Sequence, residues 1–479
     1  ALPILEILTD GTLPFIPEQL PATADAGEIG IAVDVGTTTI ALNVWSIADR
    51  KRIAVVAEEN AQLKYGHDVI KRISFAIRKP HPAEKNPVAG ESQLHYCIIA
   101  QLEKLFQKAV NEAKNALPRG FQPKIKTIVI TGNTTMLCFV CAVPVKSLAQ
   151  APFNMECPFD MTTTWKDVRE GTAAEKRAEL EKPSQELLNV FTSSVVPDDT
   201  SVYFPPCVSA FIGADTVCAM VAASFPIPGS ASNLQNESEE KAPVMLVDIG
   251  TNSEIALYIA DTAEKKGRIL CTATAAGPAF EAANISCGMS AIDGAIDSIA
   301  LDKDGMIVPH TIGGKNATGI CGSGLVSSVA TLFEHKYIEK DGAIVKSKST
   351  LGDGTACIEM TPAVYLSQQD IRNLQLAKSA VKTGLAYLLE KSPELPILYI
   401  AGGFGTKLNI EDACKISMIP EELSERTFPI GNAALAGASA LIFSPTLRLR
   451  ARELKKKAVP INLAAVPEFQ NRFLQSIDF

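Results

Sequence analysis

The same strand-like phrase occurs twice in this chain. The first copy reads AVDVGTTTIAL at 32–42 and the second reads LVDIGTNSEIAL at 246–257. In each copy an apolar, β-branched run ends in an aspartate, glycine and threonine follow, and a second apolar run resumes. This pattern is typical of a β-hairpin with a short turn. Two copies in the same strand context favour two related halves of one fold over two unrelated hairpins.

Both turns carry residue types that suit a phosphate and a hard metal ion. A carboxylate at the mouth of a strand, Asp34 or Asp248, can hold a hydrated Mg²⁺. Glycine lets the backbone approach a phosphate closely, and the residues after it offer N–H and hydroxyl donors. We therefore predict that the two turns face each other across a cleft and clamp a polyphosphate. The candidate phosphate contacts are Gly36, Thr37, Thr38, Thr39, Gly250, Thr251 and Asn252.

Charge and hydropathy exclude some classes of protein. The net charge is −8, from 53 acidic and 45 basic residues, which argues against a nucleic-acid-binding role. The longest apolar runs, such as 432–443, are shorter than the roughly 18 residues of a membrane span, so we expect a buried helix there. Eleven scattered cysteines, an odd number, indicate free thiols in a cytoplasmic protein.

The first half of the chain divides into short patterned segments. Residues 1–28 are rich in proline and weakly patterned, which predicts a linker. The spacing of apolar residues predicts a strand, a turn and a second strand over 29–44 and a strand over 126–130. Helices are expected over 62–77 and 93–116. The charged stretch 160–200 is expected to be a surface insertion, and 226–243 an acidic loop.

The second half contains one strong helix signal. Ser367 and Asp370 have the spacing of a capping box at the start of a helix over 367–389. A strand over 398–400 then runs into the glycine turn AGGFG at 401–405. Lys378 lies on a mostly apolar face of that helix, so we expect its amine to extend to water, with a contact to the nucleotide as the alternative. The expected buried face of the helix comprises Ile371, Leu374, Val381, Leu385 and Leu388.

This layout resembles the superfamily of acetate and sugar kinases, heat-shock chaperones and actin. The resemblance implies an α/β protein: a two-lobed actin/sugar-kinase-like ATPase with duplicated RNase H-like domains. The two phosphate loops of that superfamily match 34–39 and 248–252. Its adenosine motif, a glycine pair after a strand, matches 401–405, where backbone without side chains can lie against a purine and ribose. The residues implied there are Gly402, Gly403, Phe404 and Gly405.

A narrower resemblance covers nearly all of 29–445. Several phrases, in order, are similar to the reductive activators of corrinoid-dependent enzymes. Besides the two turns, these phrases are NAQLKYGHDVIKRI (60–73), TGNTTM (131–136), GADTV (213–217), TAAGPAFEAANISCGM (274–289), GICGSGL (319–325), DIRNLQLAKSA (370–380) and AGGFG (401–405). The resemblance implies ATP and Mg²⁺ as cofactors. It also implies a homodimer and, as partner, the corrinoid protein of a methyltransferase or O-demethylase system.

The same family carries a [2Fe–2S] cluster in an N-terminal ferredoxin-like domain. A plant-type cluster needs a C-x₄-C-x₂-C run, and the close pair here, Cys138 and Cys141, lies in an apolar helical run that is typical of buried thiols. We therefore expect the cluster only in a domain upstream of residue 1. On this interpretation 1–28 is the linker from that domain, 29–120 is a middle RNase H-like domain, and 121–479 is the ATPase domain.

Roles follow for several more residues. The resemblance places Asp215 where sugar kinases supply a catalytic base, although an N-cap of the following helix is an equal alternative. Asp34 and Asp215 are thus the candidate catalytic carboxylates, and Asp34 and Asp248 the candidate metal ligands through water. Glu254 either faces the site or is an ordinary polar strand residue. Gly322, Ser323 and Gly324 either contact the nucleotide or close a helix–strand turn.

Three other functions remain open at this stage. A small-molecule kinase would need a substrate pocket beside the terminal phosphate. An activator of 2-hydroxyacyl-CoA dehydratases would share a [4Fe–4S] cluster between two subunits, with Cys287 and Cys321 as the candidate ligands. A nucleotide-gated scaffold, similar to relatives of actin, would polymerise or show no steady ATPase activity.

Overall fold

The computed structural model describes residues 25–78, 89–117, 120–228, 242–261, 266–345, 349–350, 354 and 356–479. The described chain forms two compact units. The first comprises Ala1–Ile227 with Ala433–Pro460, and the second comprises Pro228–Asn432 with Ile461–Phe479. Most of the expected N-terminal linker (1–24) and of the expected acidic loop (229–241) lies outside the described residues. Division of the chain at residue 120 stays a prediction.

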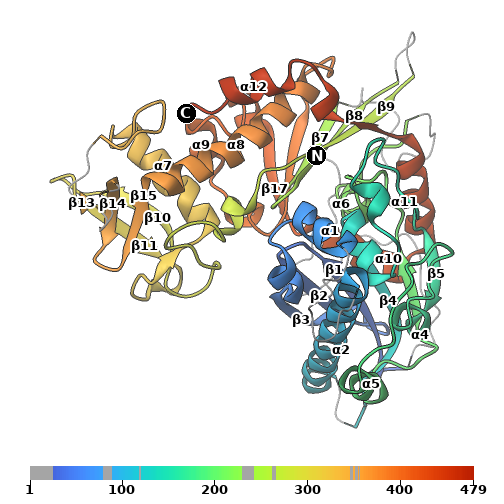
Figure 1. The fold of residues 1–479 in the computed structure, drawn as a ribbon. Coiled ribbons are helices and arrows are strands. Elements are labelled where there is room, and N and C mark those ends of the chain that lie inside the picture. Colours follow the sequence, from blue (N-terminus) through green and yellow to red (C-terminus); the bar gives the residue numbers. More distant parts are fainter. Residues whose placement is uncertain are drawn as a thin grey trace. The chain divides into compact units, whose positions relative to one another are not determined.

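The first unit is built on a mixed six-stranded sheet (Figure 1). Its first three strands form an antiparallel meander, and β4 and β6 continue the sheet in parallel with β1. The order is β3-β2-β1-β4-β6-β5. The strands are β1 (Glu28–Val35), β2 (Thr39–Ser46), β3 (Lys51–Glu59), β4 (Lys124–Gly132), β5 (Met161–Thr164) and β6 (Ser201–Phe204).

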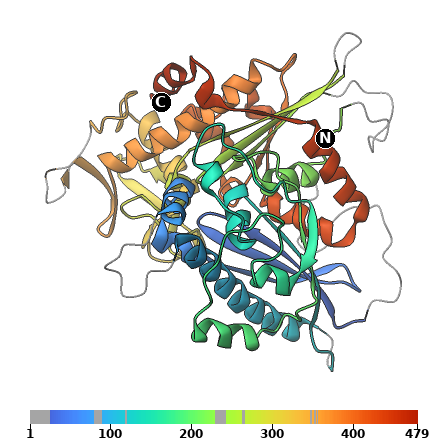
Figure 2. The same cartoon turned by 45° about the vertical axis from the view of Figure 1, so that its right-hand side comes forward.

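Helices cover both faces of this sheet. Helix α2 (Gly90–Ala116) packs on the face of Ile31 and Val33, and Figure 2 shows it lying across the strands. Helix α10 (Ala433–Phe443) packs on the opposite face, because a Cβ at Gly30 would lie 2.7 Å from Ile442. Successive strand residues point to opposite faces, so a strand covered on both faces is buried almost throughout.

Shorter helices complete the first unit. They are η1 (Ala61–Tyr65), α1 (Val69–Ile77), α3 (Thr134–Val140), α4 (Trp165–Arg169), α5 (Gln185–Thr192), α6 (Ala214–Ala222) and α11 (Pro445–Lys457). The predicted single helix over 62–77 is wrong, because Gly66 ends η1 and Asp68 caps a new helix by accepting a hydrogen bond from Lys71 N. The charged stretch 160–200 contributes the edge strand β5 and the fully buried Trp165 to this unit.

The second unit repeats the same topology. Strands β7, β8 and β9 form an antiparallel meander, and β16 and β17 follow in parallel with β7. The order of this sheet is β17-β16-β7-β8-β9-β18. Its first five strands therefore correspond, one by one, to β6-β4-β1-β2-β3 of the first unit. The strands are β7 (Val244–Ile249), β8 (Ser253–Ile259), β9 (Arg268–Thr274), β16 (Ile397–Ala401) and β17 (Thr427–Gly431), together with β18 (Ala458–Ile461), which spans the boundary between the two units at Pro460.

Two smaller sheets and further helices surround this meander. The small sheets contain β10 (Ala295–Leu301), β11 (Ile307–Thr311) and β12 (Gly319–Ile320), then β13 (Ser349–Thr350), β14 (Ala356–Thr361) and β15 (Val364–Ser367). The helices are η3 (Pro278–Glu281), α7 (Gly322–Glu334), α8 (Gln368–Leu389), α9 (Ile410–Lys415) and α12 (Phe469–Gln475). Three-residue helical turns and η6 (Glu421–Arg426) link them.

Helix α8 confirms its sequence prediction. Ser367 accepts a hydrogen bond from Asp370 N, and the Asp370 side chain accepts from Ser367 N, which is the complete capping box. The five residues of the expected apolar face are all fully buried. The predicted buried helix over 432–443 is likewise confirmed as α10.

Candidate functional site

The two repeated turns close equivalent hairpins, one in each unit. The last paired residues of the first hairpin are Val35 and Ile40, and those of the second are Ile249 and Ser253, so the second hairpin has one residue fewer between its paired strands. This difference changes what stands opposite each aspartate. Asp34 pairs with Ala41, whereas Asp248 pairs with Glu254. Two carboxylates in directly opposed strand positions repel each other, which a nearby cation would offset.

Three side chains that the sequence analysis did not single out hold the first turn. Arg72 donates to Thr37 O (2.5 Å), Asn60 donates to Gly36 O (2.8 Å), and Asn133 donates to Thr37 Oγ1 (3.1 Å). Arg72 is fully buried. The sequence could have indicated these three residues, because all of them lie in phrases that carry the family resemblance.

Asp215 is the second residue of α6, and Gly213, not Asp215, occupies the N-cap position. The N-cap alternative for Asp215 is therefore wrong. Burial, together with the negative charge of Asp34, raises the pKa of Asp215 to about 7. The helix start also packs closely on the end of β4, since a Cβ at Gly213 would lie 2.6 Å from Gly132 O. The first unit thus brings Asp34, the first turn and Asp215 together.

The glycine turn after β16 lies against the second repeated turn. A Cβ at Gly402 would come within 2.5 Å of Ile249 O and 2.8 Å of Asp248 Oδ1. In contrast, a Cβ at Gly403 would have no heavy atom within 4 Å. Gly403 is exposed and borders open space, which is the kind of cradle that a flat ligand ring can occupy.

Aromatic packing connects this turn to α7. The rings of Phe280 and Phe404 are 4.9 Å apart, and a Cβ at Gly322 would lie 1.8 Å from Phe280 O and 3.1 Å from the Phe404 ring. A Cβ at Gly324 would lie 2.0 Å from Ile296 O, and Ser323 is buried beside it. These glycines therefore allow α7 to pack closely on η3 and β10. A nucleotide contact by this segment stays a prediction.

Glu281 of η3 is hydrogen-bonded to the second turn, and the sequence analysis did not predict this contact. Its Oε1 accepts hydrogen bonds from both Thr251 N (3.0 Å) and Thr251 Oγ1 (2.9 Å). Its Oε2 is buried and has no hydrogen-bond partner among the described residues. The phrase TAAGPAFEAANISCGM contained the signal, but an isolated glutamate in a short helical turn gave no reason to connect it with Thr251.

The described residues do not form a metal site by themselves. Over the described ranges, no group of three or more His, Cys, Asp or Glu side chains could hold a metal ion. The carboxylates at the strand ends fit a hydrated Mg²⁺ that is held through water and shared with phosphate oxygens. Cys321 is buried and its thiol donates to Ile296 O, which makes it a poor ligand for a cluster shared between subunits.

The Lys378 amine does not extend to water, so that prediction is wrong. Its side chain is fully buried, and Nζ donates to Ser476 O (2.8 Å) and to Asp478 O. The last residues of the sequence return to α8 and supply these carbonyl groups, which the local apolar pattern could not reveal. Burial, and to a smaller extent the charge of Lys382, lowers the pKa of Lys378 to about 7.

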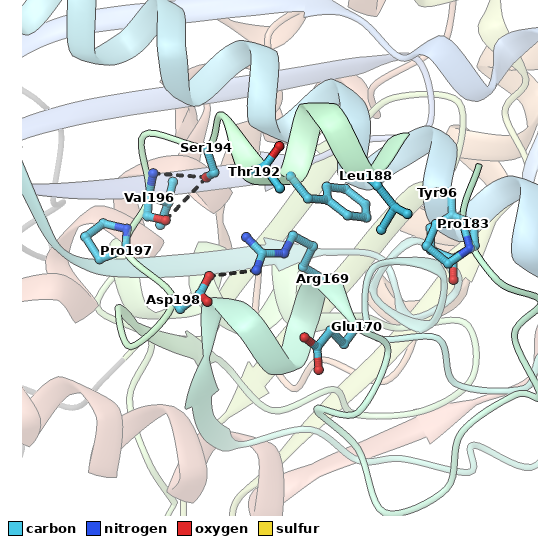
Figure 3. A pocket seen from close by; sticks show the side chains of 11 residues that line it. Tyr96, Arg169, Glu170, Pro183, Leu188, Thr192, Ser194, Val196, Pro197 and Asp198 are labelled. Carbon is cyan, nitrogen blue, oxygen red and sulfur yellow. Dashed lines mark hydrogen bonds and ion pairs between the residues drawn. The ribbon is translucent and has the colours of Figure 1, made fainter. Parts of the chain in front are cut away.

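A cavity of about 610 Å³ lies in the first unit, and no residue of the first turn lines it (Figure 3). It is lined mainly by the charged stretch 160–200 and by Tyr96 of α2. Arg169 lies in its wall, where its guanidinium pairs with Asp198 at 2.6 Å and stands over the Phe191 ring. None of the predicted site residues lines this cavity.

Comparison with known protein families shows to which family the chain belongs. A model described as the middle region of RACo matches residues 29–180, and a model of the C-terminal ASKHA domain of RACo matches residues 242–479. The chain belongs to the RACo family. The duplicated topology described above is the ASKHA fold, so the predicted fold class is confirmed.

Two curated relatives match almost the whole chain. The corrinoid activation enzyme RamQ of Eubacterium limosum is 26% identical over 473 residues, which cover 94% of this chain and 70% of RamQ. The [Co(II) methylated amine-specific corrinoid protein] reductase of Methanosarcina barkeri is 24% identical over 477 residues, which cover 94% of this chain and 77% of that protein.

A solved structure confirms the fold. The reductive activator for corrinoid, iron-sulfur protein superposes with a TM-score of 0.76 at 24% identity and covers 95% of this chain and 67% of its own. Within the part of the RACo-family chain that the structure describes, no helix has both the length and the hydropathy needed to cross a bilayer.

Proposed function

We propose that this RACo-family protein is an ATP-driven reductive activator of a corrinoid protein. It would return inactive Co(II) to Co(I) in the corrinoid protein of a methyltransferase or O-demethylase system. One electron is added to the cobalt, and a [2Fe–2S] domain is its proposed source. The observation that carries the proposal is the pair of aspartate-bearing hairpin turns in two units of equal topology, in a chain whose relatives are named for corrinoid activation.

The proposal assigns ATP and Mg²⁺ to the two turns. Three features support this assignment: the half-buried carboxylates Asp34 and Asp248 at the strand ends, the donors of the turns, and the open cradle at Gly403. When bound, Mg²⁺ would supply positive charge that offsets the charge of the transferring phosphoryl group.

The carboxylates of the chain would divide the remaining work. Asp215, close to Asp34 and with a raised pKa, would accept a hydrogen bond from the attacking water and orient it. Asp34 would hold metal-bound water beside it, and Asp248 with Glu254 would do so at the second turn. Arg72 would keep Thr37 in place by its bond to the Thr37 carbonyl group.

Hydrolysis would drive the uphill electron transfer through binding to the partner. Coupling requires that the nucleotide-bound and nucleotide-free states bind the corrinoid protein with different affinities. We propose that the activator works as a cytoplasmic homodimer. Nothing in this scheme requires nucleic acid or a membrane.

The test is a cobalamin visible spectrum recorded during activation. The protein, the Co(II) form of a candidate corrinoid protein, Ti(III) citrate as reductant and Mg²⁺-ATP are mixed anaerobically, and the Co(I) absorption band should appear only with ATP. Asp248→Ala should abolish this change, whereas Asp304→Ala, at an exposed loop carboxylate, should not. ATP turnover that rises with a sugar or a small acid and ignores every corrinoid protein would instead indicate a kinase.

A further inference from the structure

The second turn differs from the first in the partner of its threonine. In the first turn Thr37 Oγ1 receives a hydrogen bond from Asn133, and Thr37 O receives one from Arg72. In the second turn Thr251, the equivalent residue, donates its N–H and its hydroxyl to a single oxygen of Glu281. The first turn is thus held by side chains that donate hydrogen bonds to it, whereas the second is held by a carboxylate that accepts them.

The Glu281 contact has the form of a phosphate contact. An anionic oxygen receives both the backbone N–H and the hydroxyl of one turn residue, as a phosphate oxygen does in such turns. The Cβ position of Gly250 is 3.5 Å from the same Glu281 oxygen, so the carboxylate lies over the glycine–threonine corner of the turn. A phosphate that approached these donors would meet a negative charge already bound to them.

The other oxygen of Glu281 is poorly satisfied. Glu281 Oε2 is buried and accepts no hydrogen bond from the residues that the structure describes. A buried carboxylate oxygen that receives no donor from the described residues is less stabilised than a fully hydrogen-bonded one, so this carboxylate can gain hydrogen bonds when it moves into solvent. Such a group is easily exchanged for a better anionic ligand.

We infer that Glu281 is an internal substitute for phosphate at the second turn. In the nucleotide-free protein its carboxylate occupies the Thr251 donors, and a nucleotide phosphate replaces it there. Once displaced, the carboxylate can accept hydrogen bonds from water at the site. The inference rests on the proposed assignment of ATP to these turns, and it makes Glu281 a determinant of nucleotide affinity.

The test compares the binding of a non-hydrolysable ATP analogue, the β,γ-imido triphosphate, by calorimetry. Glu281→Ala and Glu281→Gln should both bind the analogue about tenfold more tightly than the unchanged protein in EDTA, because charge-assisted contacts no longer compete. The gain should be smaller with Mg²⁺, since the cation screens the repulsion between the two anions. Glu359→Gln, at an exposed carboxylate of the same unit, is the matched control and should show no gain.

A second readout follows the Thr251 amide itself. Hydrogen exchange at this amide should be faster in Glu281→Ala without nucleotide and should slow again when the analogue binds. If the unchanged protein binds the analogue and both Glu281 variants bind it equally or more weakly, the inference is wrong while the proposed function stands. If neither the unchanged protein nor the variants bind it, the proposed function fails as well.

Discussion

Gly402 and Asp248 lie so close together that a methyl group at position 402 would come within 2.8 Å of Asp248 Oδ1. Gly402 also has a φ of +98°, which side-chain-bearing residues rarely adopt. The glycine turn after β16 is therefore fixed against the strand end that carries the candidate metal ligand. The neighbouring Gly403 has neither constraint, and this contrast provides a matched pair of variants.

Gly402→Ala should lower the free energy of unfolding by about 2 kcal/mol, from the unfavourable φ and the contact with Ile249 O, and should abolish ATP hydrolysis. Gly403→Ala should change stability by less than about 0.5 kcal/mol, yet raise the KM for ATP because its methyl group enters the open cradle. Urea unfolding and steady-state kinetics measure both effects. An unchanged KM in Gly403→Ala would contradict the placement of the nucleotide there.

Arg72→Met should disrupt the first turn. Arg72 donates to Thr37 O at 2.5 Å and to Gly66 O at 2.9 Å, and the variant leaves both carbonyl groups buried without a partner. We expect a loss of about 2–4 kcal/mol in unfolding free energy and at least a tenfold loss in kcat/KM for ATP. Arg72→Lys should not restore either value, because one ammonium group cannot span both carbonyl groups.

The control for this prediction is the next residue along the helix. Lys71 is exposed and pairs with Asp68 at 3.1 Å, so Lys71→Met should change stability by no more than about 1 kcal/mol and leave activity intact. Equal losses in the Lys71 and Arg72 variants would show that the first turn does not depend on the buried guanidinium.

Asp215→Asn should stabilise the nucleotide-free protein as the pH rises. Burial and the charge of Asp34 raise the folded-state pKa of Asp215 from 3.8 to about 7, so between these pH values the folded protein binds a proton that the unfolded chain has lost. The contribution of Asp215 to stability therefore falls from about pH 4 to above pH 7. At pH 8 in EDTA the variant should be more stable by up to roughly 4 kcal/mol, and at pH 4 the difference should vanish.

The same variant should have no measurable ATP hydrolysis, because an amide cannot accept a proton or orient water as a carboxylate does. Asp199→Asn, at an exposed carboxylate of the same unit, should keep both its activity and its pH profile of stability. A variant at position 215 that hydrolyses ATP normally would assign Asp215 a purely structural role.

Lys378→Met should reveal a buried amine with a lowered pKa. The folded-state pKa of Lys378 is about 7 against 10.5, so between these pH values the unfolded chain binds a proton that the folded protein lacks. The free energy of unfolding of the unchanged protein should thus rise with pH across this window, relative to the variant. From pH 6.5 to 9 we expect this relative gain to be roughly 2 kcal/mol by urea unfolding.

Limited proteolysis gives a second measurement of the Lys378 contact. Loss of the bonds from Nζ to Ser476 O and Asp478 O should expose the last residues of the sequence to cleavage in the variant. Lys391→Met, on the exposed side of the Tyr387 ring, is the control. A pH-independent difference between the unchanged protein and Lys378→Met would mean that the amine stays charged when buried.

The two-lobed fold was implied by the resemblance to a known superfamily, whereas the two hairpins and the capped helix α8 were determined by the sequence itself. These features depend on local patterns: alternation along a strand, apolar spacing along a helix, and side chains that bond to backbone within three residues. The break at Gly66 shows the limit of such reasoning, because a glycine and a new cap interrupted a pattern that otherwise fitted one helix.

Only the tertiary structure decided which distant residues complete each turn. Arg72 meets Thr37, Glu281 meets Thr251, and Lys378 meets Asp478 across 35, 30 and 100 residues. Buried polar groups must find partners wherever the fold brings them, and no local spacing encodes that choice. The burial of Asp215 and its position beside Asp34, which together raise its pKa, likewise follow from parallel strands meeting at one edge of the sheet.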